Sequence, residues 1–447
     1  MSSYTIYLSG IFMCAARPKF FVALAHTDTI AYFSAEFEYE RIRVSNLNLF
    51  PEKMKENLLF SMSFDSAIHY DTMESKLDPL GDTFAIKNQD KPPKRIFADC
   101  GAFQFRNLEK PILEDGVELD HNIAWSYYEK KHVLSNHQWE EILLCSPDHI
   151  ITPDLDDKQV ESRYKFIREN AAPFLQHTKK DSRISAVGVI HGRNNDERMS
   201  QYEMFKNLGY DYVALGGMVP YSTKQEMALN IIAGIYDMNN PKIDPNSILG
   251  KCRSDGIKLH IFGLNSPEWV RWWYRLNIDS FDGSKLSTEG AANGWYYIAN
   301  DGKGIGRNLP DKPESVKQLY QRIAVKKMGA ENWQWLTNSN NLSIPVVPIT
   351  DRGVDTSCNC PACQYLTSAR CTSQRCWYHK MNPDVHHIAD PRMMGSTEHN
   401  MGRVSHNAFV FSWIISQIEY YNTLADNSVV NEENSWLRNW RTIEVKK

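Results

Sequence analysis

Short apolar runs recur along the chain from about residue 96, and polar stretches with helical spacing separate several of them. The apolar runs lie at 96–98, 149–152, 186–190, 212–215, 257–262 and 278–281. The helical stretches lie at 159–175, 196–208, 224–236 and 267–276. Strands that alternate with helices indicate a parallel sheet. Six or more such units over about 190 residues favour an α/β TIM (β/α)8 barrel over an open two-layer fold.

The chain divides into three parts on this pattern. Residues 1–95 mix short apolar runs with polar loops, and we expect them to pack on the barrel or to contribute to it. Residues 96–300 carry the alternating pattern and form the expected barrel core. Residues 301–447 form a C-terminal region with a different charge and most of the cysteines.

The composition is that of a folded protein. The 447 residues are 42% hydrophobic and 23% charged, which excludes a largely disordered chain. No run approaches the roughly 18 apolar residues of a transmembrane helix, so no membrane partner is expected. The apolar start has its first basic residue only at Arg17, which is unlike a secretory signal peptide, and we expect a cytoplasmic protein.

The formal charge of −4 is unevenly distributed. Residues 301–447 hold 17 Lys+Arg and 14 Asp+Glu, a net of +3, so residues 1–300 hold 33 and 40, a net of −7. A basic region beside an acidic body is one way to attract a polyanion without a basic overall charge. A solvated helical face is an equally good interpretation of the same charges.

Aspartates follow or end three of the expected strands. They are Asp99, Asp154 and Asp282, while His191 and glycines follow other strands. A single aspartate after a strand is more often a turn or helix-cap residue. Three aspartates at the C-terminal ends of barrel strands favour an active site, because active sites of such barrels lie at that end. Two inward carboxylates suit displacement at a glycosidic carbon, where one attacks and the other handles the leaving-group proton.

Four motifs in order resemble the tRNA-guanine transglycosylase family. They read Asp99-Cys-Gly-Ala-Phe-Gln104, Gly188-Val-Ile-His-Gly192, Ala214-Leu-Gly-Gly217 and Ile278-Asp-Ser-Phe-Asp282. The family's motifs read roughly DSGGFQ, GIVQG, AVGG and DMFD. The spacing from Gly263 to Asp282 also fits. The resemblance covers about 99–285 and again 356–420.

The resemblance implies a role for each matching residue. Asp282 corresponds to the nucleophile that displaces guanine and holds the sugar covalently, and Asp99 to the general acid and base. Asp154 corresponds to the carboxylate that pairs with the base edge, and His191 stands where the family usually has Gln. The other substrate-binding residues implied are Phe103, Gln104, Leu215, Gly216 and Gly217. Asp279 is expected to be structural.

Five of the nine cysteines lie within 19 residues, which favours a local metal site over a disulfide framework. Cys358, Cys360 and Cys363 form a compact thiolate knuckle that needs one more ligand for tetrahedral zinc. The resemblance implies His406 as that ligand, with His399 as a competitor. Such a site has no open position, so it implies a structural zinc-binding subdomain. Cys371 and Cys376 are either a second site or two unrelated thiols.

Several departures from the tRNA enzymes favour the branch that modifies DNA. Residues 283–288 lack the arginine of the bacterial loop that holds the anticodon, and only 41 residues follow His406, too few for the archaeal RNA-binding extension. The chain is therefore similar to the 7-deazaguanine DNA-modification transglycosylases of phages and bacteria. This implies replacement of guanine in DNA by a 7-deazaguanine, usually 7-cyano-7-deazaguanine, which protects the DNA from restriction.

Two alternatives remain. One is a tRNA-guanine transglycosylase of the queuosine or archaeosine type, and the other is a non-catalytic subunit of such an enzyme. The sequence also leaves open whether a separate ATPase-like partner is required. The aromatic clusters at 272–274 and 295–297 could stack on displaced bases, although core packing is the favoured interpretation of them.

Overall fold

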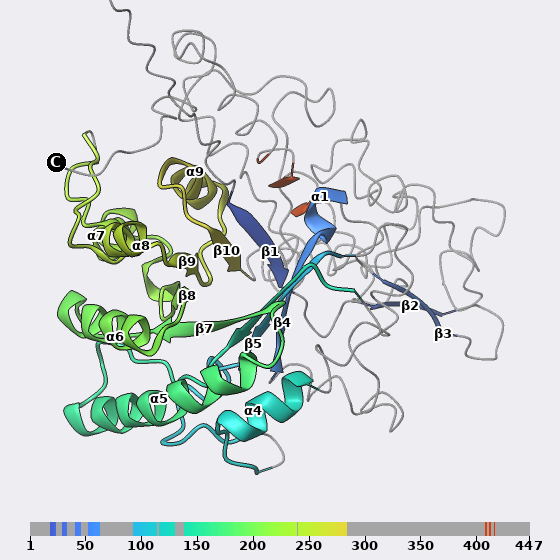
Figure 1. The fold of residues 1–447 in the computed structure, drawn as a ribbon. Coiled ribbons are helices and arrows are strands. Elements are labelled where there is room, and N and C mark those ends of the chain that lie inside the picture. The colour runs from blue at the N-terminus through green and yellow to red at the C-terminus, as the bar shows by residue number, and fades with distance from the viewer. Residues whose placement is uncertain are drawn as a thin grey trace, which may run out of the picture.

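Eight parallel strands close into a barrel in this computed structural model (Figure 1). It describes residues 18–23, 29–33, 41–45, 52–62, 93–113, 116–129, 138–238, 240–283, 407–408, 411–412 and 415. The order around the barrel is β1-β10-β9-β8-β7-β6-β5-β4, and β1 pairs with both β10 and β4. The predicted α/β barrel is confirmed, while the predicted zinc ligands lie outside the described residues.

The barrel strands are short and drawn from both the N-terminal part and the core of the chain. They are β1 (Lys19–Ala23), β4 (Asn57–Ser61), β5 (Arg95–Asp99), β6 (Glu141–Cys145), β7 (Ile184–Ile190), β8 (Tyr212–Leu215), β9 (Lys258–Ile261) and β10 (Ser280–Gly283). A separate antiparallel pair is formed by β2 (Thr29–Phe33) and β3 (Arg41–Ser45). The first 95 residues therefore supply two of the eight barrel strands.

Helices lie outside the barrel strands (Figure 1). They are α1 (Glu52–Lys55), α4 (His121–Tyr128), α5 (Asp157–Thr178), α6 (Asn195–Leu208), the 3-10 turn η5 (Val219–Tyr221), α7 (Gln225–Ala233), α8 (Ile248–Asp255) and α9 (Pro267–Arg275). A capping box between Asp156 and Gln159 begins α5, and Gly209 in the left-handed region ends α6. Within the described part of the chain, no helix is long and apolar enough to cross a membrane.

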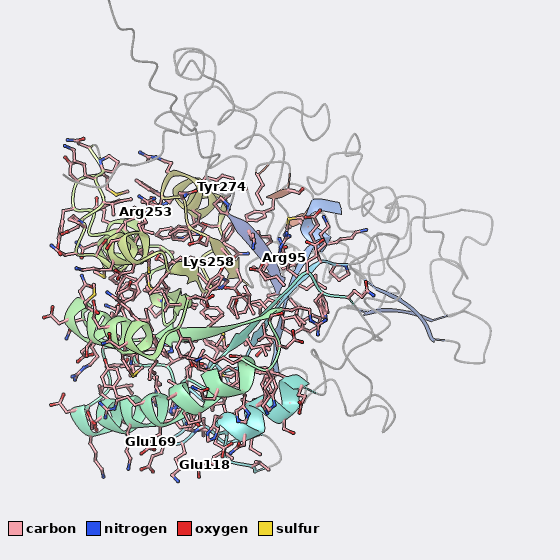
Figure 2. All side chains as sticks on the ribbon, in the orientation of Figure 1. Arg95, Glu118, Glu169, Arg253, Lys258 and Tyr274 are labelled. Carbon is pink, nitrogen blue, oxygen red and sulfur yellow. The ribbon has the colours of Figure 1, made fainter. Side chains whose placement is uncertain are left out.

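Side chains of alternate strand residues build two separate cores. Figure 2 shows that side chains fill the space between the strands and the helices outside them. On β5, Phe97 packs inside the barrel, whereas Ile96 and Ala98 pack in the outer core between strands and helices. The inner core is Phe21, Leu59, Phe97, Leu143, Cys145, Val187, Val189, Tyr212 and Ala214. Because strand side chains alternate with a period of two, Asp99 faces the same side as Phe97.

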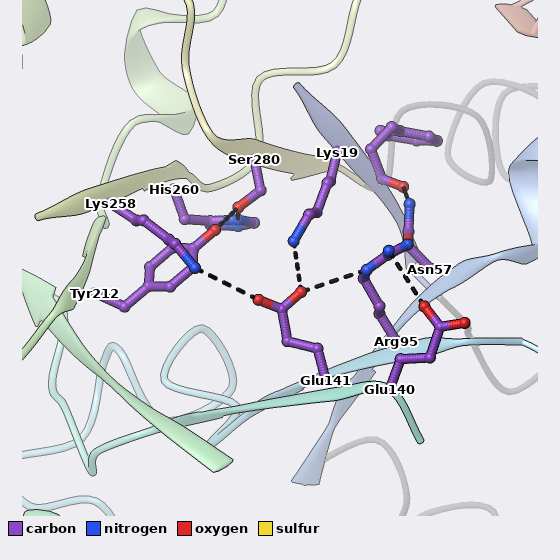
Figure 3. Close-up of polar contacts among 10 residues, drawn as sticks. Lys19, Asn57, Arg95, Glu140, Glu141, Tyr212, Lys258, His260 and Ser280 are labelled. Carbon is purple, nitrogen blue, oxygen red and sulfur yellow. Dashed lines mark hydrogen bonds and ion pairs between the residues drawn. The ribbon is translucent and has the colours of Figure 1, made fainter. Parts of the chain in front are cut away.

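The N-terminal end of the barrel is closed by charged groups. Figure 3 shows Glu141 facing Lys19, Arg95 and Lys258, each the first residue of its strand. The carboxylate of Glu141 lies 2.5 Å from Nζ of Lys19, 3.4 Å from Nε of Arg95 and 3.7 Å from Nζ of Lys258. One partly buried anion thus ties four strands together at the end opposite Asp99.

The strand predicted at 149–152 is wrong. The barrel strand is β6, whose Ile142 pairs with Ile96 of β5 and Ile184 of β7. Residues 149–152 belong to the connection after β6, where His149 and Ile151 are buried. A short apolar run can thus be explained by burial alone, without strand pairing.

The aromatic cluster at 272–274 belongs to the core. Trp272, Trp273 and Tyr274 are buried on α9. The indole N–H of Trp273 donates to the carbonyl of Leu264 at 2.8 Å, and its ring stacks on Trp269 at 5.1 Å. These residues are therefore unavailable for stacking on bases. Residues 295–297 lie outside the described part.

Candidate active site

Two aspartates face the barrel interior at the C-terminal ends of their strands. Asp99 is the last residue of β5, and Asp282 lies on β10, two residues after the inward-facing Ser280. The negative charge of Asp282 raises the pKa of Asp99, so the two carboxyl groups are within electrostatic reach. The structure therefore brings together the two residues expected to carry the chemistry.

Asp282 is buried and held through one oxygen. Its Oδ1 accepts a hydrogen bond from the backbone N–H of Gly263 at 2.9 Å and lies 3.4 Å from Nε2 of His260. Gly263 has a positive φ of 76°, which favours glycine, and a Cβ there would meet Val219. Oδ2 has no hydrogen-bond partner among the described residues, which leaves it available to attack a carbon atom.

Asp99 has an environment that favours its protonated form. Burial is the largest cause that raises its pKa to about 7, and the negative charges of Asp148 and Asp282 add to it. The N–H of Gly101 and the hydroxyl of Ser61 oppose the shift but do not cancel it. A carboxyl group with a pKa near neutrality can both donate and accept a proton at physiological pH.

A third aspartate of the site, Asp148, is buried and was not predicted from the sequence. Its Oδ1 accepts from the thiol of Cys100 at 2.8 Å, and its Oδ2 lies 2.6 Å from Nε2 of His191. Burial, then the charge of Asp148, raises the pKa of Cys100 well above its ordinary value, so Cys100 is a thiol that donates. Asp148 was missed because the preceding strand was placed at 149–152, which pointed to Asp154 instead.

Asp99, Cys100 and Asp148 are also a possible set of metal ligands. One ligand atom from each lies within 4.8 Å of the others. The hydrogen bond from the Cys100 thiol to Oδ1 of Asp148 accounts for the contact between those two side chains, and Asp99 bonds instead to the N–H of Gly101 and to Ser61.

His191 lies against the glycines that follow β8. Its backbone N–H donates to Oε1 of Gln201 at 2.8 Å, and its Nδ1 is buried without a hydrogen-bond partner among the described residues. A Cβ at Gly216 would overlap the imidazole, so only glycine fits there. Leu215 is buried at the end of β8, and Gly217 has a positive φ of 68°. His191, Gly216 and Gly217 are therefore adjacent.

The remaining predicted site residues are exposed. Phe103 is half exposed, and the guanidinium of Arg106 lies 3.8 Å from its ring centroid. Gln104 is exposed and donates its backbone N–H to Gly101 at 2.9 Å. Asp154 lies exposed in the connection after β6, where a hydrogen bond with Thr152 lowers the pKa of its carboxyl group. No hydrogen bond or ion pair joins Asp154 to Asp99, Asp282 or His191 within the described ranges.

Comparison with known proteins gives one informative similarity. No family model matches the chain. The chain is 26% identical over 221 residues to a DNA-guanine transglycosylase of Salmonella montevideo. The match spans 48% of this chain and 42% of that protein. It supports the resemblance to the transglycosylase superfamily drawn from the motifs.

The pKa of Asp99 can be tested through its neighbour. Asp148→Asn removes a negative charge, so the pKa of Asp99 should fall below about 7. The measurement is an infrared titration of the protonated carboxyl band, assigned by its loss in Asp99→Asn. Asp154→Asn is the matched control and should leave the titration unchanged. An equal shift in both variants, or none in Asp148→Asn, would contradict the assigned cause.

Proposed function

We propose that this chain is a guanine transglycosylase that exchanges guanine in DNA for a 7-deazaguanine base, namely 7-cyano-7-deazaguanine. The observation that carries the proposal is the pairing of two unlike carboxyl groups at one barrel end. Asp282 has one oxygen without a partner among the described residues, and the pKa of Asp99 is raised to about 7. The similarity to a DNA-guanine transglycosylase supports DNA as the substrate.

In the first half-reaction, Oδ2 of Asp282 attacks C1′ of the target nucleotide. The bond from C1′ to N9 of guanine breaks, and the protonated carboxyl group of Asp99 gives its proton to the departing base. In the second half-reaction, Asp99 takes the N9 proton of the incoming base. That nitrogen attacks C1′, and the bond from C1′ to Asp282 breaks. Both carboxyl groups return to their starting states.

The base would lie beside His191 and the two glycines. Nε2 of His191 lies 2.6 Å from Oδ2 of Asp148, and Nδ1 is buried beside Gly216 and Gly217 with no hydrogen-bond partner among the described residues. The backbone groups of Leu215, Gly216 and Gly217 would then contact the base edge. A contact from Asp154 to the base stays a prediction, as does one from Gln104. Asp148 would act on the base indirectly, through its contact with His191.

DNA imposes a further requirement, because a base inside a duplex cannot reach the barrel end. The enzyme must flip the guanine out or act on single-stranded DNA. Phe103 carries a half-exposed ring with the Arg106 cation over it, and such a pair is suited to stacking on a neighbouring base. We therefore assign Phe103 to the base plane or its neighbour.

The biological setting belongs to the same proposal. Replacement of guanine would protect DNA from restriction enzymes in the cytoplasm of a bacterial or phage-infected host cell. A separate ATPase-like partner remains part of the hypothesis for duplex opening. A tRNA-guanine transglycosylase and a non-catalytic subunit are the competing functions.

We also infer a structural zinc ion bound by Cys358, Cys360, Cys363 and His406, with His399 as the alternative fourth ligand. These residues lie outside the described part. The residues that follow His406 support a packed segment there, because Asn407 and Ala408 are buried and the ring of Phe411 lies 5.0 Å from Phe20 of β1. Four protein ligands leave no position for a reacting water.

Metal analysis of the purified protein tests the zinc inference. About one zinc per chain is expected, and Cys360→Ser should lose it together with much of the folded yield. Cys252→Ser, which changes a buried cysteine on α8, is the control and should keep the zinc. Equal zinc content in the two variants would contradict the ligand assignment.

The substrate can be tested with one incorporation assay. The chain is incubated with radiolabelled 7-cyano-7-deazaguanine and, in parallel, duplex DNA, single-stranded DNA or tRNA. Label should enter DNA, with one guanine released for each base incorporated. Label in tRNA alone would replace the proposal by the tRNA function. Label in no nucleic acid would favour the non-catalytic subunit.

A further inference from the structure

A buried chain of hydrogen bonds leads through the barrel interior to Asp282. The hydroxyls of Tyr212 and Ser280 lie 2.7 Å apart, and Oγ of Ser280 lies 2.7 Å from Nδ1 of His260 (Figure 3). Nε2 of His260 then lies 3.4 Å from Oδ1 of Asp282. Tyr212, Ser280 and His260 come from three adjacent strands and are at most 1% exposed.

One arrangement of hydrogen atoms satisfies every group in this chain. Burial lowers the pKa of His260 despite the opposing charge of Asp282, so the imidazole is neutral and carries one N–H. The carboxylate of Asp282 can only accept, which places that hydrogen on Nε2. Nδ1 then accepts from the hydroxyl of Ser280, and Ser280 accepts from Tyr212. Each of the three side chains is satisfied in this one arrangement.

Aromatic rings hold the imidazole in place. The ring centroid of His260 lies 4.3 Å from that of Phe97, 4.6 Å from that of Phe262 and 6.2 Å from that of Phe21. Such packing leaves little room for the ring to rotate away from Asp282. A buried polar chain in an otherwise apolar core is unfavourable unless it is fully hydrogen-bonded, and this one is.

We propose that His260 is a positioning residue that fixes the Asp282 carboxylate for nucleophilic attack, with Ser280 and Tyr212 setting its tautomer. The proposal rests on the nucleophilic role of Asp282 in the proposed function. Nε2 of His260 and the backbone N–H of Gly263 both lie within hydrogen-bonding distance of Oδ1. Oδ2 is therefore the oxygen held toward the reacting carbon. When Asp282 leaves C1′ in the second half-reaction, its negative charge returns, and both donors stabilise it.

Two substitutions of His260 separate positioning from packing. His260→Phe keeps an aromatic ring but removes the N–H, and we expect kcat to fall by about 10- to 100-fold with little change in KM. His260→Gln loses the ring stacking, but its side-chain amide can still donate to Asp282. It should retain several-fold more activity than His260→Phe. A packing role predicts the reverse order, and thermal unfolding of each variant reports how far packing is lost.

The upstream residues give a graded test. Ser280→Ala removes the donor to Nδ1 and should lower kcat less than His260→Phe does. Tyr212→Phe removes only the last hydroxyl and should have the smallest effect. An effect of Tyr212→Phe equal to that of His260→Phe would contradict a role that acts through His260.

A readout without substrate keeps this proposal distinct from the proposed function. The ¹⁵N spectrum of histidine-labelled protein, with His260 assigned by its loss in His260→Phe, should show hydrogen on Nε2 and none on Nδ1. Hydrogen on Nδ1 would overturn the positioning role whatever the activity. An active wild type with His260→Phe equally active would overturn that role alone. A wild type inactive on every nucleic acid would overturn the proposed function and the role that rests on it.

Discussion

The alternation of side chains along parallel strands in a closed barrel is the constraint on which the site depends. On β5 it places Asp99 on the same side as the inner-core residue Phe97, and on β10 it places Asp282 on the same side as Ser280. Parallel strands all end at the same edge, so the two carboxyl groups meet there. The same geometry gathers the first residues of four strands around Glu141 at the opposite end.

The two carboxyl groups differ because their surroundings differ. The pKa of Asp99 is raised by burial and by the charges of Asp148 and Asp282, which favour its protonated form. Oδ1 of Asp282 accepts a hydrogen bond from the N–H of Gly263 and lies 3.4 Å from Nε2 of His260. In a displacement at a sugar carbon, one carboxyl group carries the proton and the other is the nucleophile. Different environments give the two groups these different roles.

Much of the barrel could be predicted from the sequence, and the site only in part. The helices predicted at 159–175 and 196–208 correspond to α5 and α6, whose ends carry capping signals. The strand misplaced at 149–152 concealed Asp148, because a buried apolar run resembles a strand when pairing partners are unknown. His260 was missed for a related reason, since its contact with Asp282 depends on the register between β9 and β10.

Trapping the covalent intermediate tests the central claim most directly. Guanine-containing DNA is mixed with the protein and quenched in denaturant, and the attached residue is identified by peptide mass spectrometry. The account predicts a sugar ester on Asp282 that is absent in Asp282→Asn. The ester should still form in Asp279→Asn, because the Asp279 carboxyl group accepts from the Leu259 N–H and is not assigned to the reaction. An adduct on another residue, or one that persists in Asp282→Asn, would contradict the assignment of the nucleophile.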